Sequence, residues 1–223
     1  MLACTTSEGY TVTDQRLVEI VKKLQVESKK RNFVETVELA VNLKDIDLSN
    51  PRNRIQEDIV LPHGRGKAIK VGVFGGSEMA VKAKGVADIV VQPEEIEDLA
   101  TDKAKARKFA RASDYFVAEA PLMPTIGKRL GIILAPRGKM PKPIPPGSDP
   151  GAAIQKLKSS VTIRTRDKMT FHMPVGSKDM PAEDLAENID VVLGRITSKL
   201  ERGRQNIRSA YVKTTMGPSY KVI

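Results

Sequence analysis

The sequence predicts an α+β domain split between the two ends of the chain, with an inserted α/β domain that contains a doubly wound, Rossmann-like sheet. Two observations predict this arrangement. The N-terminal part contains one helix pattern and two strand patterns, too few to complete a sheet, and the C-terminal part adds further strands and a helix. The middle instead alternates strand and helix, as parallel sheets do. We therefore expect residues 1–67 and 157–223 to form one domain and residues 68–156 the insert.

The N-terminal part changes from a helical to a strand period. Residues 14–30 predict a helix, because apolar side chains recur at helical spacing. Residues 33–43 predict a half-buried strand, and a second strand is expected at 58–62. The apolar residues behind these predictions are Leu17, Ile20, Val21 and Leu24 in the helix, and Val37, Leu39, Val41 and Leu43 in the strand.

The run His63-Gly64-Arg65-Gly66-Lys67 contains glycine and lysine, as phosphate-binding loops do, but lacks their spacing. A Walker loop requires glycine where Leu61 stands and Ser or Thr where Ala68 stands. We interpret this run as a flexible basic connector, and it is the first crossing between the two predicted domains.

The insert is predicted to contain strands at 71–74, 87–91 and 115–118, with helices at 77–84, 93–112, 123–130 and 152–157. Its glycines at 72, 75 and 76 do not have the G-x-G-x-x-G spacing of dinucleotide-binding proteins, so no nucleotide is expected. Residues 135–147 are basic and rich in proline. They are either a stiff surface loop or part of the path of a bound polyanion, and the sequence does not decide between these.

The C-terminal part is predicted to contain a hairpin, an amphipathic helix and a strand. The hairpin strands are 161–165 and 169–173, with a charged turn at 166–168, and the helix is 181–200. The last strand ends near Thr214, before Gly217-Pro218. His172 falls on the polar face of its strand without a nucleophile or carboxylate nearby in sequence, so we interpret it as a surface histidine.

The charge balance favours a polyanionic partner. Lys and Arg number 37 against 27 Asp and Glu, a formal charge of +10. A membrane partner is not expected, because no apolar run approaches the roughly 20 residues that span a bilayer and the start does not resemble a signal peptide. The single cysteine, Cys4, fits a reducing cytoplasm, and with two histidines it leaves no soft-metal set. No cofactor is expected.

The stretch from Ser209 to Ser219 combines features that suit RNA. Hydroxyls, a thioether and a glycine stand together in Thr214-Thr215-Met216-Gly217, within a strongly basic tail. Small polar groups beside bare backbone can approach a sugar–phosphate chain closely. The alternative is a plain strand ending in a Gly-Pro turn, which composition alone favours.

Five stretches follow one another along the chain: FVETVE at 33–38, LPHGRGK at 61–67, PRGKMP at 136–141, FHMPVG at 171–176 and VKTTMGPS at 212–219. They cover essentially the whole chain, and the last is the most specific. In this order they resemble the family of the universal large-subunit ribosomal protein L-one, in its archaeal form.

The resemblance implies a structural RNA-binding protein rather than an enzyme. It implies a mobile stalk that binds large-subunit rRNA beside the tRNA exit site and aids release of deacylated tRNA. It also implies, in many members, repression of translation through a similar site on the protein's own mRNA. We expect a monomer away from the ribosome. The RNA contacts carried over from the family are Phe33, Thr36, Lys168, Ser209, Thr215, Met216 and Gly217; we add Thr214 from the same motif, and Arg164 and Arg166 from their charge alone.

Two rival functions come from other classes. An enzyme built on the insert is disfavoured, because the sequence shows no nucleophile–base pair, metal cluster or phosphate loop. A general architectural protein would bind nucleic acid by charge alone. It would lose affinity with salt equally for cognate and random RNA, whereas a specific binder keeps a difference between them.

Overall fold

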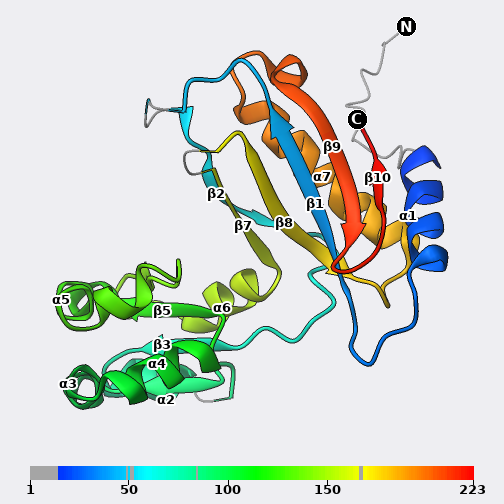
Figure 1. Ribbon diagram of the computed structural model, residues 1–223. Coiled ribbons are helices and arrows are strands. Elements are labelled where there is room, and N and C mark those ends of the chain that lie inside the picture. The colour runs from blue at the N-terminus through cyan, green and yellow to red at the C-terminus, as the bar shows by residue number, and fades with distance from the viewer. Residues whose placement is uncertain (1–14, 49, 51–52, 84, 166–167) are drawn as a thin grey trace, which may run out of the picture. The chain divides into compact units, whose positions relative to one another are not determined.

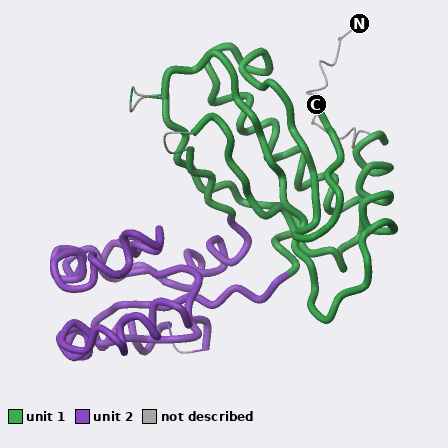
Figure 2. Tube along the Cα trace, in the orientation of Figure 1, with its two compact units in different colours: residues 1–66, 161–223 green, residues 67–160 purple. Residues whose placement is uncertain are grey.

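The computed structural model describes residues 15–48, 50, 53–83, 85–165 and 168–223. The chain forms two compact units, and Figure 2 colours them separately. Unit 1 comprises residues 1–66 and 161–223, and unit 2 comprises residues 67–160. The second crossing therefore lies four residues later than the sequence predicted. The reason is that helix α6 (Pro150–Lys158) buries Ile154 and Leu157 in the core of unit 2.

Unit 1 is built on a four-stranded antiparallel sheet in the order β10-β9-β1-β8 (Figure 1). The strands are β1 (Thr36–Leu43), β8 (Thr170–Ser177), β9 (Ile207–Thr214) and β10 (Ser219–Lys221). Helices α1 (Gln15–Glu27) and α7 (Ala182–Lys199) contribute their apolar side chains to the same core as the inward-facing residues of β1. The alternation predicted for residues 37–43 is present, because every second side chain belongs to that core: Val37, Leu39, Val41 and Leu43.

The hairpin predicted for residues 161–173 is wrong. Strand β7 (Ser160–Arg164) pairs with β2 (Gln56–Val60) in a separate two-stranded sheet, whereas β8 pairs with β1. Long-range partners decide this: the Thr165 N–H donates to the Ile55 carbonyl (2.9 Å), and Met173 lies opposite Leu39. Local sequence shows two apolar strands but cannot show which distant edge each one meets.

Unit 2 contains a parallel four-stranded sheet in the order β4-β3-β5-β6. Alternate strand residues face two separate apolar clusters, one with α3, α4 and α5 and the other with α2 and α6, so helices cover both faces as predicted. The elements are β3 (Val71–Phe74), α2 (Ser77–Ala83), β4 (Ile89–Val91), α3 (Pro93–Thr101), α4 (Lys103–Ala112), β5 (Tyr115–Glu119), α5 (Met123–Leu134) and β6 (Lys142–Ile144).

Two local features of unit 2 differ from the sequence prediction. The single helix expected at 93–112 is broken at Asp102, whose extended backbone ends α3 and whose carboxylate caps α4 by accepting from the Ala104 and Lys105 N–H groups (2.8 and 3.1 Å). The proline-rich run contains the strand β6, at an edge of the sheet, where proline is tolerated. In the same run, the Lys139 ammonium donates to the Ala110 and Ser113 carbonyls, so this cation closes the end of α4.

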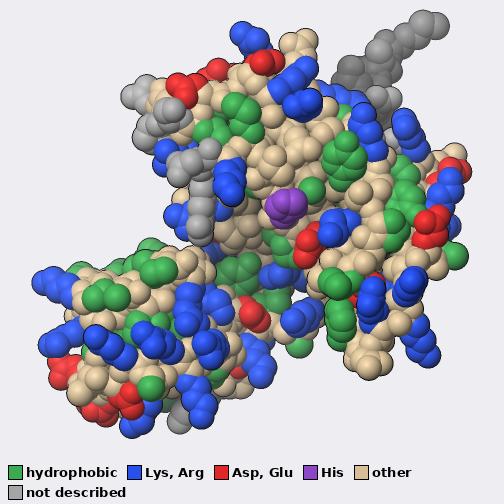
Figure 3. Space-filling model, viewed as in Figure 1, with side chains coloured by type: hydrophobic (Ala, Val, Ile, Leu, Met, Phe, Trp, Pro, Cys, Tyr) green, Lys and Arg blue, Asp and Glu red, His purple; other side chains and the backbone are tan. Residues whose placement is uncertain are grey.

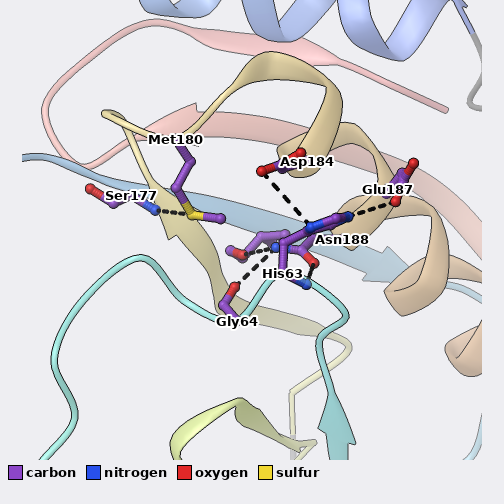
Figure 4. A network of polar contacts seen from close by, with 8 residues as sticks. His63, Gly64, Ser177, Met180, Asp184, Glu187 and Asn188 are labelled. Atoms are coloured by element: carbon purple, nitrogen blue, oxygen red, sulfur yellow. Dashed lines mark hydrogen bonds and ion pairs between the residues drawn. The ribbon is translucent and has the colours of Figure 1, made fainter.

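The connector that leaves unit 1 is anchored to α7 (Figure 4). The buried Asn188 amide donates to the Gly64 and Val175 carbonyls (3.0 and 3.1 Å) and accepts from the His63 N–H (3.3 Å). His63 Nε2 lies 2.7 Å from a Glu187 carboxylate oxygen and Nδ1 lies 3.8 Å from that of Asp184. Gly64 and Gly66 both have a φ of 64°, a conformation that glycine adopts without strain.

Candidate nucleic-acid interface

The face of the unit 1 sheet turned away from α1 and α7 is open. Successive residues of a strand point to opposite faces, so the open face carries the residues between the buried apolar ones of β1. Figure 3 shows this side of unit 1: tan backbone and uncharged polar atoms make up much of it, with hydrophobic patches, a histidine and a few charged side chains near the middle and more Lys and Arg around it. Such a surface suits close approach of a sugar–phosphate chain, with cations at its border.

A row of polar side chains crosses three strands of this face. The Thr170 hydroxyl donates to Asn42 Oδ1 (2.8 Å), and the Asn42 amide donates to Ser209 Oγ (2.8 Å). Ser209, a predicted contact, is mostly buried and holds this row at the β9 end. Its oxygen accepts from Asn42, so the hydroxyl hydrogen remains to donate to a ligand.

The turn after β9 is fastened to the start of β1, as the distant stretches 33–36 and 214–217 come together. The Thr215 N–H donates to the Thr36 carbonyl (3.0 Å), and the Thr36 N–H donates to Thr215 Oγ1 (3.2 Å). Thr215 Oγ1 also lies 3.3 Å from the Thr36 carbonyl. The hydroxyl therefore extends the strand pairing by one step while Thr215 itself stays exposed.

Thr214 and Gly217 have structural roles inside the turn. Thr214 is fully buried, so its side chain does not reach the surface, and we drop it from the proposed contacts. A Cβ atom at position 217 would lie 2.2 Å from Thr214 Oγ1, far inside van der Waals contact. Glycine is thus required by the packing of the turn itself, before any ligand is considered.

Two exposed apolar side chains lie close to the Thr36–Thr215 junction in the chain, Phe33 three residues before Thr36 and Met216 directly after Thr215. Phe33 is 53 % exposed in the loop before β1, and Met216 is 60 % exposed at the tip of the turn. The Phe33 loop lines a pocket of about 310 Å³ together with residues 29–32, 34–35 and 178–179, among them four basic side chains (Lys29, Lys30, Arg31 and Lys178). Exposed apolar groups beside cations can contact bases and phosphates at one site.

Of the remaining predicted residues, Lys168 lies toward the other end of the sheet and Arg164 lies on the separate two-stranded sheet. Lys168 is exposed in the segment between β7 and β8, and Arg164 is exposed at the end of β7. The Met169 carbonyl accepts from the Leu43 N–H (2.8 Å), so this segment adjoins the end of β1 opposite to Thr36. β1 is eight residues long, so at a rise of about 3.4 Å per residue its seven steps separate Thr36 from the Lys168 segment by roughly 24 Å. Arg166 lies outside the described residues.

Sequence reasoning missed two members of this face. Asn42 stands between two buried residues, Val41 and Leu43, and that position alone would have placed it on the open side. His172, which we interpreted as a plain surface histidine, is exposed opposite Ala40 and shares that residue as a neighbour with Tyr211. Ala40 itself is buried between these two strands.

No described group of three or more His, Cys, Asp or Glu side chains could hold a metal ion. No helix in the described parts of the chain is long and apolar enough to cross a membrane. At the carboxyl ends of β3 and β5, where doubly wound folds bind ligands, the Glu119 carboxylate lies near Gly76, and an acid there opposes phosphate binding.

Comparison with known proteins identifies the family of the chain. Residues 22–218 match the ribosomal protein L1p/L10e family. A protein of Methanocella arvoryzae named large ribosomal subunit protein uL1 is 55 % identical, over 92 % of this chain and 97 % of its own. Proteins with the same name from Thermoplasma acidophilum and Archaeoglobus fulgidus are 54 % and 51 % identical, over 91 % and 95 % of this chain and 93 % and 99 % of their own. The chain therefore belongs to the ribosomal protein L1p/L10e family in its archaeal form, a family of structural ribosomal proteins and not of enzymes.

Proposed function

We propose that this protein is a component of the large ribosomal subunit that binds structured rRNA through the open sheet face and the 214–217 turn of unit 1. The observation that carries the proposal is the junction of Thr36 with Thr215, flanked by the exposed Phe33 and Met216. It presents hydroxyls, bare backbone and apolar side chains on a pre-formed surface, which suits RNA read through its ribose and shape.

The finer roles rest on the family resemblance. We propose that the protein forms the mobile stalk beside the tRNA exit site and aids release of deacylated tRNA. We also propose that it binds its own mRNA and represses translation. In this proposal it acts in the cytoplasm, on the ribosome, and is a monomer away from it. Unit 2 carries 16 Lys and Arg against 10 Asp and Glu, a surplus suited to a tRNA backbone.

The test is recovery of bound RNA from lysate followed by sequencing. We expect a fragment of large-subunit rRNA, and this fragment should bind more tightly than a scrambled RNA of equal length at every salt concentration. Equal affinities that fall together with salt would show a general charge binder. Competition between the rRNA fragment and the protein's own mRNA then tests repression, because both should occupy one site.

A further inference from the structure

A buried carboxylate lies directly behind the proposed RNA-binding turn. Glu35 is 2 % exposed, although its neighbours Phe33 and Val34 are both exposed. Its Oε1 accepts from the Met216 N–H (3.3 Å) and lies 3.8 Å from Arg31 Nε. Its Oε2 is buried without a hydrogen-bond partner among the described residues. The side chain thus connects the loop before β1 with the tip of the turn.

The backbone of the same residue is held from another side. The Lys178 N–H donates to the Glu35 carbonyl (2.9 Å), and the Lys178 ammonium donates to the Ser28 carbonyl (3.0 Å). The Gln25 amide, from α1, donates in turn to the Lys178 and Met180 carbonyls (3.0 and 2.8 Å). The base of the Phe33 loop is therefore bonded to the 178–180 segment, and Glu35 transmits this fixed position to the turn.

An acid at this place is unfavourable by charge alone. A carboxylate repels a polyanion, and burying it costs free energy that one hydrogen bond and a partial ion pair offset incompletely. A hydrogen bond from a backbone N–H to a carboxylate is, however, roughly twice as strong as one between neutral groups. A buried acid at this place is therefore explained if RNA affinity gains more from the fixed position of the Met216 backbone than it loses through repulsion by the Glu35 carboxylate.

We propose that Glu35 is a positioning residue for RNA binding: it holds Met216 and the turn against the Phe33 loop without touching the RNA. This inference rests on the proposed function. It predicts a change in RNA affinity opposite in sign to the change that long-range charge repulsion alone would cause. Glu35→Ala removes a negative charge from an RNA-binding protein, yet it should weaken binding to the recovered rRNA fragment about tenfold, since the turn loses a charge-assisted hydrogen bond.

Two further variants separate charge from reach. Glu35→Gln removes the charge but keeps an acceptor of the same length, so affinity should stay within about threefold of the parent. Glu35→Asp keeps the charge but withdraws the oxygen by one methylene, so it should behave like Glu35→Ala. Glu57→Ala is the matched control. The Glu57 carboxylate also has one buried oxygen without a hydrogen bond, but Glu57 lies on β2, away from the turn, and pairs with Arg195 of α7. It should leave the affinity unchanged or raise it slightly.

Hydrogen exchange of the Met216 amide in the free protein gives a readout independent of RNA. Exchange should be faster in Glu35→Ala and Glu35→Asp than in the parent or Glu35→Gln, while circular dichroism shows all of them folded. The proposal is overturned if Glu35→Ala binds like Glu57→Ala, or if Met216 exchange is unaffected. A parent protein that does not prefer the rRNA fragment to scrambled RNA would overturn the proposed function itself, and this is seen before any variant is measured.

Discussion

The unit with the larger surplus of positive charge is not the unit that carries the proposed RNA-binding face. Unit 2 has the larger surplus, 16 Lys and Arg against 10 Asp and Glu, while unit 1 has 21 against 17. Cations of both units have internal partners: the Lys139 and Lys158 ammonium groups of unit 2 donate to backbone carbonyls, and so does that of Lys178 in unit 1. The pre-formed hydroxyl and backbone surface, however, lies in the less basic unit. Net charge therefore indicates the class of partner, and local geometry indicates where it binds.

The largest effect is expected when the two units are separated. Replacing residues 67–160 with a Gly/Ser linker should leave a folded unit 1 that keeps most of the rRNA affinity. Unit 2 alone should lose at least about a thousandfold, or roughly 4 kcal/mol, because it lacks the turn and the open face. The measurement is binding of the rRNA fragment by each piece after circular dichroism. A linked unit 1 that binds more than a hundredfold more weakly than the parent would contradict the comparison.

The turn should contribute through geometry. Thr215→Val removes the oxygen that accepts from the Thr36 N–H, leaving that group unpaired, and should weaken binding by about 1–3 kcal/mol. Gly217→Ala should weaken it at least as much, because its Cβ would collide with Thr214 Oγ1. The measurement is a salt titration of rRNA binding.

Neither of these changes removes a cation, so the slope of log affinity against log salt should stay constant. Gly131→Ala is a suitable control, because a Cβ there would meet no atom within 4 Å in unit 2. If Thr215→Val and Gly217→Ala bind like this control, the turn is a structural feature alone.

A cation at the border should behave in the opposite way. Lys168→Ala should flatten the salt slope by about one unit if Lys168 contacts a phosphate, with a modest loss of affinity at physiological salt. Lys103→Ala, at the start of α4 in unit 2, is the matched control and should leave the slope for the rRNA fragment unchanged. Equal slopes for Lys168→Ala and the parent would place the RNA elsewhere.

The smallest effect is expected at the connector. The Glu187 carboxylate, through its hydrogen bond, raises the pKa of His63, and Asp184 adds to this, against a lowering by burial. Protonated His63 therefore stabilises the folded state. This contribution is complete below the unfolded pKa near 6.5 and is lost as pH rises through the higher folded pKa.

Denaturant unfolding across this pH range should show a slight fall in stability that His63→Gln abolishes. Because the imidazole is about one-third exposed, solvent screening keeps the effect small. His172→Gln, on the open sheet face, serves as the control. A His63→Gln protein with the parent's pH dependence would exclude this network as its cause.

The features that depend on local pattern could be predicted from the amino-acid sequence alone. The alternation in residues 37–43 requires one buried and one open face of β1, whatever its partners are. The alternating strands and helices between residues 71 and 134 require a parallel sheet with helices on both sides. The side chains at 214–217 are of kinds that suit RNA, but composition alone favours a plain Gly-Pro turn, and the family resemblance is what selected this motif as an RNA contact.

The tertiary structure decided which segments meet. Asn42 and Ser209 are bonded across 167 residues, and Thr36 and Thr215 across 179, so no local window contains either pair. β7 and β8 have similar apolar strand patterns in the sequence, yet they join different sheets. The reason is that pairing and register depend on the distant strand that each one meets. Burial of Thr214 and the position of Glu35 behind Met216 follow from that pairing, since strand β9 ends where the loop before β1 begins.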